Sequence, residues 1–230
     1  MKEKDMLNLK LNGVDVQAEE GWTLLETAQF YGLPIPTLCH HEGLSPYGAC
    51  RLCVVEIGVG PNTKLVSSCT YPAEEGLVVR THSKRVEKAR KMVVELLLAT
   101  CPDSRTIQDI AASMEVQRTR FKVRHDDCIL CGLCVRMCAE QMSGKAIGFV
   151  NRGELRKITT PFDIRSEDCR LCGGCMYICP ACQLRCQGPE APGVVCGSCL
   201  NVSPICLEEY EDALCYLDPC CQCLKEEIKK

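Results

Sequence analysis

The stretch Cys128-Ile129-Leu130-Cys131-Gly132-Leu133-Cys134-Val135-Arg136-Met137-Cys138 carries the most informative pattern in the chain. Its four cysteines have the spacing C-x2-C-x2-C-x3-C. The same spacing occurs once more, closed by Pro180, at Cys169, Cys172, Cys175 and Cys179. Two copies of one cysteine spacing in one segment predict a pair of similar metal sites rather than scattered structural thiols.

This spacing is the one that holds [4Fe–4S] clusters in bacterial-type ferredoxins, where the fourth cysteine of each run binds the other cluster. One predicted [4Fe–4S] site therefore consists of Cys128, Cys131, Cys134 and Cys179. The other consists of Cys138, Cys169, Cys172 and Cys175. A zinc site is the alternative, which two identical runs disfavour. Ala139 replaces the usual proline after the first run, and we expect this to affect packing rather than ligation.

A second kind of cysteine set lies within the first 80 residues. Its members have the spacing C-x10-C-x2-C-x15-C and are Cys39, Cys50, Cys53 and Cys69. Four cysteines on a small β-rich domain suit a [2Fe–2S] cluster, with a structural zinc site as the alternative. Gly48 and Ala49 stand just before the close pair, where backbone amides must approach the sulfides.

The elements around this set predict a compact α+β unit. Apolar residues alternate on both sides of Asn12-Gly13, a dipeptide that favours a two-residue hairpin turn. Thr23 and Glu26 form a capping-box pattern that opens a short helix through Phe30. Two further strands are expected at Val54–Ile57 and Leu77–Val79.

Residues 81–120 predict a helical linker. Ser83 is placed to cap a helix that runs to Ala99, with one face formed by Val86, Arg90, Val93 and Leu97. A second helix is expected from Arg105 to Met114. Cys101 lies between the two helices and is expected to be a buried structural thiol.

Composition limits what the chain can be. It has 230 residues, of which 22 are cysteine. No run of 18 apolar residues occurs, so we expect no membrane insertion. The N-terminus has no apolar signal region, which favours a cytoplasmic protein whose cysteines stay reduced and bind metal. A net charge of −3 gives no support for nucleic-acid binding.

The last segment, residues 188–230, is a cysteine-rich tail. The density of thiols predicts one further iron–sulfur cluster or a zinc ion, and a reduced tail without metal is the alternative. The expected ligands are Cys196, Cys199, Cys206 and Cys215.

With these motifs in view, the chain resembles the iron–sulfur electron-entry subunits of NAD-linked hydrogenases and respiratory complex I, and the N-terminal part of iron-only hydrogenases. The resemblance rests on Pro36-Thr37-Leu38-Cys39, Gly48-Ala49-Cys50-Arg51-Leu52-Cys53, Ser68-Cys69-Thr70, Glu95–Ala99, Cys131–Cys138 and Cys172–Cys175. It implies a β-grasp [2Fe–2S] ferredoxin domain at 1–80, a helical linker at 81–120, a two-cluster [4Fe–4S] ferredoxin domain at 121–187 and the tail at 188–230.

The chain departs from that family in two places. Many members hold an additional [4Fe–4S] cluster after the leucine-rich helix, using one histidine and three cysteines. Only Cys101 stands in that stretch here, so we expect that cluster to be absent. The sequence also ends at residue 230, before the large active-site domain of iron-only hydrogenases, so we expect no active site in this chain.

The resemblance implies an electron-transfer subunit between an NAD(H)-binding flavin subunit and a separate catalytic subunit. A small thioredoxin-like [2Fe–2S] subunit is a further implied partner. A nickel–iron hydrogenase is the favoured catalytic partner, and an electron-bifurcating form would also couple to ferredoxin. The alternatives are the same role in a formate dehydrogenase or a complex I-like enzyme, and, from another class, a metal-binding scaffold for assembly.

Overall fold

The structure is a computed structural model that describes residues 6–164 and 166–181. Its first element is the hairpin expected near the N-terminus. Strand β1 (Met6–Leu11) pairs antiparallel with β2 (Val14–Glu19), and Leu9 lies opposite Val16. Asn12 and Gly13 between them have φ of 53° and 88°. Both values belong to the left-handed region that this two-residue turn requires. The hairpin prediction is therefore confirmed.

Three more strands complete a mixed sheet in the order β2-β1-β5-β3-β4. They are β3 (Val54–Ile57), β4 (Lys64–Ser67) and β5 (Val78–Arg80). Strand β5 is parallel to β1, and every other neighbouring pair is antiparallel. Sequence patterning placed β3 and β5 but missed β4, because Lys64 and Ser67 interrupt the apolar signal.

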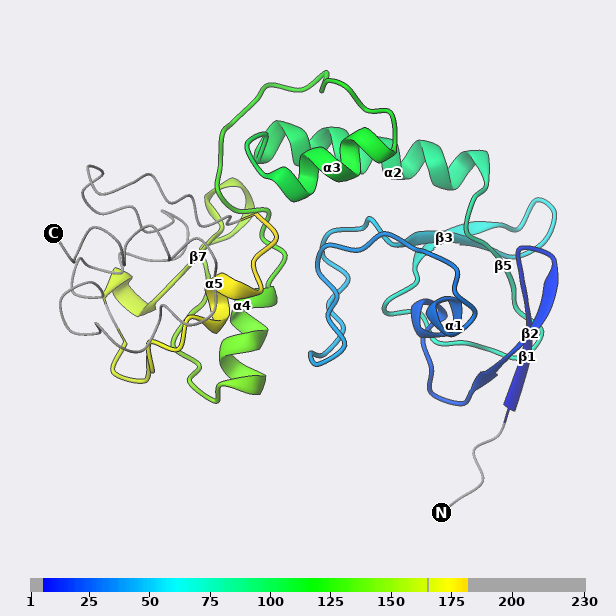
Figure 1. The fold of residues 1–230 in the computed structure, drawn as a ribbon, viewed down its shortest axis with the longest axis horizontal. Coiled ribbons are helices and arrows are strands. Elements are labelled where there is room, and N and C mark those ends of the chain that lie inside the picture. Colours follow the sequence, from blue (N-terminus) through cyan, green and yellow to red (C-terminus); the bar gives the residue numbers. More distant parts are fainter. Residues whose placement is uncertain (1–5, 165, 182–230) are drawn as a thin grey trace, which may run out of the picture. The chain divides into compact units, whose positions relative to one another are not determined.

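Helix α1 (Leu24–Phe30) covers one face of this sheet (Figure 1). It begins as expected with a capping box, because the Thr23 side chain accepts from the Glu26 backbone and the Glu26 carboxylate accepts from the Thr23 backbone. The helix buries Leu24, Leu25 and Ala28 in one core together with Leu9, Leu11, Val55, Ile57 and Val79. The sheet with α1 packed against it confirms the predicted α+β ferredoxin-like domain.

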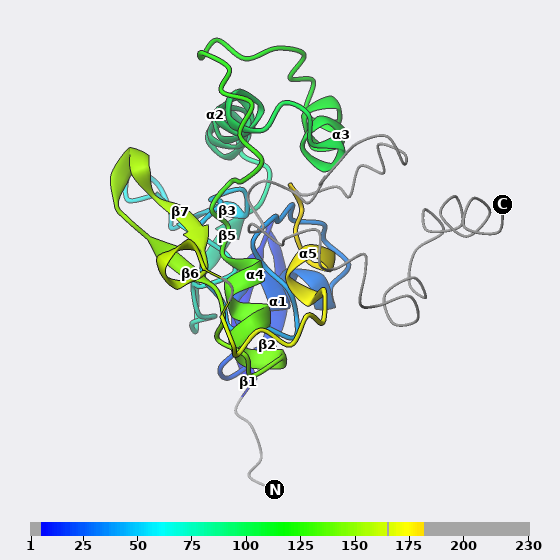
Figure 2. The same cartoon turned by 90° about the vertical axis from the view of Figure 1, so that its left-hand side faces the viewer.

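Two helices follow the sheet and lie side by side (Figure 2). Helix α2 (Lys84–Thr100) begins at the predicted cap Ser83, and α3 (Arg105–Ser113) is capped by Ser104. The buried face of α2 differs from the expected one: Val94 and Ala99 are buried, while Val93 and Leu97 are only half-buried. The burial follows the i, i+4 row through Val86, Arg90 and Val94, because this row faces the sheet.

The chain divides into two units, Met1–His125 and Asp126–Lys230, so the two helices belong with the first sheet. The second unit contains α4 (Leu133–Arg136), a π-helical turn η1 (Met137–Gln141) and α5 (Gly174–Tyr177). Along the chain, a hairpin of β6 (Gly148–Val150) and β7 (Lys157–Thr159) lies between η1 and α5. The 3-10 turns Gly153–Leu155 and Pro161–Asp163 flank β7.

One cluster of the described residues in the second unit buries Cys134, Ile147 and Ile158, with Leu130, Val135 and Phe149 packed against them. Cys134 belongs to the first cysteine run, so metal binding there would add to the stability of the fold. Within the described residues, no helix is both long and apolar enough to cross a membrane.

Candidate metal centres

Three loops of the first unit bring the four cysteines of the N-terminal set together. Cys39 follows α1, Cys50 and Cys53 precede β3, and Cys69 follows β4. The Sγ atoms of Cys53 and Cys69 are 3.3 Å apart, and the Cys50 backbone N–H donates to Cys39 Sγ at 3.4 Å. Cys50 is half-buried and the other three are buried, and none of the four forms a disulfide with another described cysteine.

The pKa values of these thiols show how closely the four sulfurs approach one another. Hydrogen bonds from the Cys50 and Cys69 side chains lower the pKa of Cys39 to about 2, and a hydrogen bond from Cys69 lowers the pKa of Cys53 to about 6. The donors Cys50 and Cys69 have raised pKa values, chiefly because each hydrogen-bonds to Cys39. Negative charge therefore collects at one point, where a cationic metal centre would stabilise it.

Backbone amides also point at this sulfur cluster. The amides of Ala49 and Cys50 hydrogen-bond to Cys39, and the backbone of Leu38 and Leu52 hydrogen-bonds to Cys50. Such bonds stabilise thiolates and are a known control on iron–sulfur potentials. Across the described ranges, no three His, Cys, Asp or Glu side chains are arranged to hold a single metal ion. The chemistry of the four thiols fits the four thiolate ligands of an iron–sulfur cluster.

The two cysteine runs of the second unit share one backbone conformation. Leu130 and Gly132 have φ of 55° and 71°, and the equivalent Leu171 and Gly173 have φ of 52° and 68°. In each run a short helix, α4 or α5, starts directly after that glycine. The repeat seen in the sequence is therefore also a repeat of local backbone conformation.

Electrostatic neighbours show which cysteines lie together. Burial raises the pKa of Cys134, followed by the charges of Cys131, Cys179 and Cys128. Burial likewise raises the pKa of Cys175 to about 11, followed by the charges of Cys172, Cys138 and Cys169. The last cysteine of each run is thus within electrostatic range of the third cysteine of the other run, and Cys134 also senses the charge of Cys175.

The first run ends in the π-helical turn η1, which contains Cys138. Its Sγ accepts from the Ala146 backbone at 3.3 Å, and Leu130 N–H donates to Cys128 Sγ at the same distance. Ala139 has the backbone N–H that proline lacks, so the helix continues past Cys138. Short π-helical turns occur frequently at functional sites.

Two sequence predictions concern cysteines outside these two cysteine-rich sites. Cys101 is buried at the C-terminal end of α2, apart from both cysteine sets in sequence. The tail ligands predicted at Cys196, Cys199, Cys206 and Cys215 lie outside the described residues.

Sequence patterning missed one charged residue beside the first site. Arg90 was expected only as a member of a helix face, yet it is buried and its Nη2 donates to the Val54 carbonyl at 2.8 Å. Val54 directly follows Cys53. The available signal was an arginine in the i, i+4 row between Val86 and Val94, where an apolar residue would ordinarily stand.

Comparison with known protein families assigns both sites to iron–sulfur domains. Residues 4–84 match a 2Fe-2S iron-sulfur cluster binding domain, and residues 127–183 match a 4Fe-4S dicluster domain. The boundaries enclose all twelve cysteines described above.

Among curated proteins, the chain is similar to the NADPH-Fe(3+) oxidoreductase subunit alpha of Geobacter sulfurreducens, with 32% identity over 181 residues. It is also 32% identical over 180 residues to the NADH-ubiquinone oxidoreductase 75 kDa subunit of Reclinomonas americana. Each match covers 67% of this chain but only 21% and 26% of the relatives. The chain therefore spans about a quarter or less of the length of these proteins.

A solved structure is similar over a larger share of both chains. One chain of the crystal structure of NAD+-reducing [NiFe]-hydrogenase in the H2-reduced state superposes with a TM-score of 0.68 and 27% identity. The match covers 81% of this chain and 90% of that chain.

Proposed function

We propose, from the relation of this chain to the iron–sulfur subunits of NAD(P)H-linked oxidoreductases, that it is the electron-transfer subunit of an NAD-linked hydrogenase. The observation that carries the proposal is the order of one [2Fe–2S] domain and one dicluster domain in a chain that matches nearly the whole of a hydrogenase chain. Iron–sulfur clusters accept and donate single electrons, and the protein sets their potentials by ligation, burial and hydrogen bonding.

For the N-terminal domain we assign Cys39, Cys50, Cys53 and Cys69 as ligands of one [2Fe–2S] cluster. Each iron of such a cluster takes two thiolates. The contacts suggest the pairs Cys39 with Cys50 and Cys53 with Cys69, because each pair is joined by a hydrogen bond to sulfur. Ser68 supports the second pair, since its hydroxyl donates to the Cys53 carbonyl at 2.8 Å and so holds two loops in register.

For the dicluster domain we assign Cys128, Cys131, Cys134 and Cys179 to one [4Fe–4S] cluster and Cys138, Cys169, Cys172 and Cys175 to the other. The electrostatic neighbours of Cys134 and Cys175 support this exchange of the fourth ligand. Because the fourth cysteine of each run would bind the cluster held by the other run, the two clusters would lie close together. Electron transfer between clusters requires such a short distance.

The proposed partners are a flavin subunit that binds NAD(H), a thioredoxin-like [2Fe–2S] subunit and a nickel–iron hydrogenase, in the cytoplasm. Similarity to a chain of an NAD+-reducing [NiFe]-hydrogenase supports this choice. Coupling to ferredoxin by electron bifurcation is an extension of the same proposal. The tail at 188–230 is proposed to bind one more cluster or a zinc ion through Cys196, Cys199, Cys206 and Cys215.

A complex I-like or NADPH-dependent reductase is the second candidate. It is favoured by the 32% identity to the 75 kDa subunit and to the NADPH-Fe(3+) oxidoreductase subunit alpha. Both candidates use the same chain of clusters, so the partner that co-purifies distinguishes them.

The test is hydrogen-dependent reduction of NAD+ and NADP+ by the anaerobically purified complex. A Cys134→Ser chain should reduce this activity at least about tenfold, because one [4Fe–4S] cluster loses a buried ligand. Cys101→Ser is the matched control, since Cys101 is equally buried but outside the proposed ligand sets. Full activity with Cys134→Ser would contradict the assignment. A complex that oxidises NADH or NADPH but never consumes hydrogen would favour the second candidate.

A further inference from the structure

Arg90 lies in an unusual environment for a guanidinium. Only 5% of the residue is exposed, and it stands between the fully buried Val86 and Val94 on α2. Its Nη2 donates to the Val54 carbonyl, whereas its buried Nε has no hydrogen-bond partner among the described residues. Burying a charged group this way is costly unless an opposite charge compensates it.

No carboxylate of the described residues supplies that compensation at contact distance. None of the ion pairs formed in the described ranges involves Arg90. Burial lowers the pKa of Arg90, and the charges that oppose this are those of Cys53 and Glu87. Glu87 is exposed, so water screens it. The Val54 carbonyl that Arg90 binds directly follows Cys53, so the buried guanidinium lies beside a loop of the first metal site.

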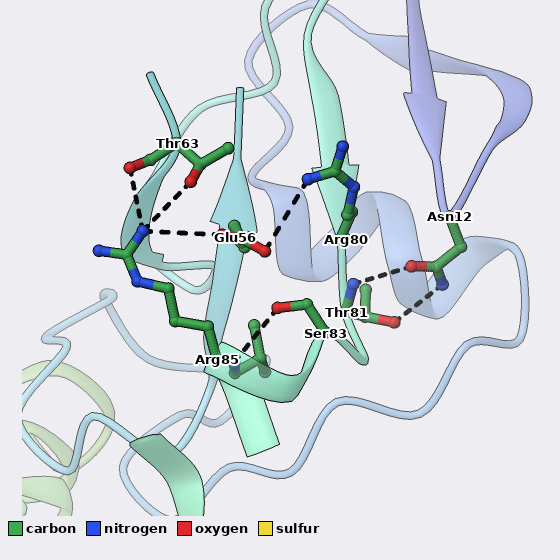
Figure 3. Close-up of polar contacts among 8 residues, drawn as sticks. Asn12, Glu56, Thr63, Arg80, Thr81, Ser83 and Arg85 are labelled. Atoms are coloured by element: carbon green, nitrogen blue, oxygen red, sulfur yellow. Dashed lines mark hydrogen bonds and ion pairs between the residues drawn. The ribbon is translucent and has the colours of Figure 1, made fainter. Parts of the chain in front are cut away.

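Polar contacts around Glu56 and Ser83 fix the start of the helix that carries Arg90 (Figure 3). Ser83 caps α2, and Arg85 Nη1 donates to the Thr63 carbonyl at 3.1 Å and lies 3.6 Å from Glu56 Oε1. Arg80 Nη1 lies 3.9 Å from the other oxygen of Glu56. These contacts hold the first turn of α2 against strand β3, so Arg90 reaches the carbonyl beside Cys53 in a defined geometry.

We propose that Arg90 is a positioning residue that compensates the charge of the [2Fe–2S] site and raises its reduction potential. The inference rests on the proposed ligand assignment. A cluster with four thiolates is anionic, and reduction adds one more negative charge. Arg90 is a fixed cation bound to the carbonyl of Val54, the residue after Cys53, so it stabilises the reduced cluster more than the oxidised one. Because Arg90 is buried, water screens this attraction little.

The test is a redox titration of the full-length, anaerobically purified chain followed by EPR of the reduced [2Fe–2S] cluster. Arg90→Met should lower the reduced-to-oxidised ratio at a fixed potential about tenfold, which is about 59 mV for one electron. Arg90→Lys keeps the charge and should restore most of the shift. Lys88→Met removes an exposed charge from the same helix and should change the ratio less than about twofold.

The [4Fe–4S] signals of the same samples serve as an internal reference and should keep their potentials. If Arg90→Met fails to assemble, the potential of the [2Fe–2S] cluster is compared between Val93→Glu and its uncharged control Val93→Gln. A carboxylate at Val93, three residues along α2, would neutralise Arg90 without removing it and should lower the potential in the same direction.

Two negative results are distinguishable. An intact [2Fe–2S] signal whose potential is the same in Arg90→Met, Arg90→Lys and the wild type would show that Arg90 only anchors the helix. A competently assembled wild-type chain with no [2Fe–2S] signal would instead overturn the proposed site itself.

Discussion

Gly48→Ala is predicted to weaken the [2Fe–2S] site without changing any ligand. Gly48 has φ of +69°, and a Cβ added there would lie 3.1 Å from Thr70 Cγ2. A left-handed alanine costs about 1–2 kcal/mol. The close contact adds about 1 kcal/mol, because Thr70 must move. Thr70 follows Cys69 and Gly48 precedes Cys50 by two residues, so the strain falls on two ligand loops.

Gly76→Ala is the matched control for backbone strain. Gly76 has nearly the same φ, +73°, but nothing lies within 4 Å of the added Cβ. Both variants should lose the cost of the left-handed alanine, and Gly48→Ala should lose about 1 kcal/mol more from the contact. Gly48→Ala should therefore release [2Fe–2S] iron to a chelator about fivefold faster than Gly76→Ala, since about 1.4 kcal/mol corresponds to tenfold. Visible circular dichroism follows the release.

Thr70→Ser combined with Gly48→Ala separates the contact from the strain. Serine keeps the hydroxyl that donates to the Ser67 carbonyl at 3.3 Å but lacks the Cγ2 atom. The double variant should therefore recover part of the cluster retention. Equal release rates in Gly48→Ala and Gly76→Ala would refute the reasoning.

Three further perturbations have defined outcomes. The pKa of Glu56 is lowered by hydrogen bonds to Ser83 and Thr63 and by nearby arginines. Its ionised form therefore stabilises the fold above the unfolded value of about 4.3, and this contribution disappears as the pH falls through the lowered pKa. Glu56→Gln should thus lower the melting temperature more at pH 7 than at pH 3, and an equal loss at both would contradict this. Thr23→Ala should cost about 1 kcal/mol in urea denaturation, because it removes the α1 cap; an unchanged midpoint would argue against the capping box. A Cys196→Ser, Cys199→Ser double variant should lose iron or zinc, and full metal content together with normal assembly would exclude the tail site as drawn.

The parts of the fold that the sequence predicts are those that depend on interactions between residues close together in the chain. The Asn12-Gly13 turn, the Thr23 capping box and the Ser83 cap each satisfy backbone groups within a few residues, so their sequence signals are direct. Strand β4 carries no such signal. It is defined by its pairing with β3, in which Val66 lies opposite Val55.

The cysteine sets were recognisable because cluster ligation requires particular spacings. The role of Arg90 was not, since it depends on a contact with Val54 that spans 36 residues of sequence. The local signal is limited to its place in the i, i+4 row between Val86 and Val94. Tertiary packing decides whether a charged residue on a helix face meets water or a metal site.

The most direct test of the central claim is the iron and sulfide content of the full-length chain, purified without oxygen and combined with EPR after reduction. One [2Fe–2S] and two [4Fe–4S] clusters predict at least about ten irons per chain and two distinct classes of EPR signal. A fully assembled sample with clearly fewer irons, or one that is colourless and loaded with zinc, would contradict the account.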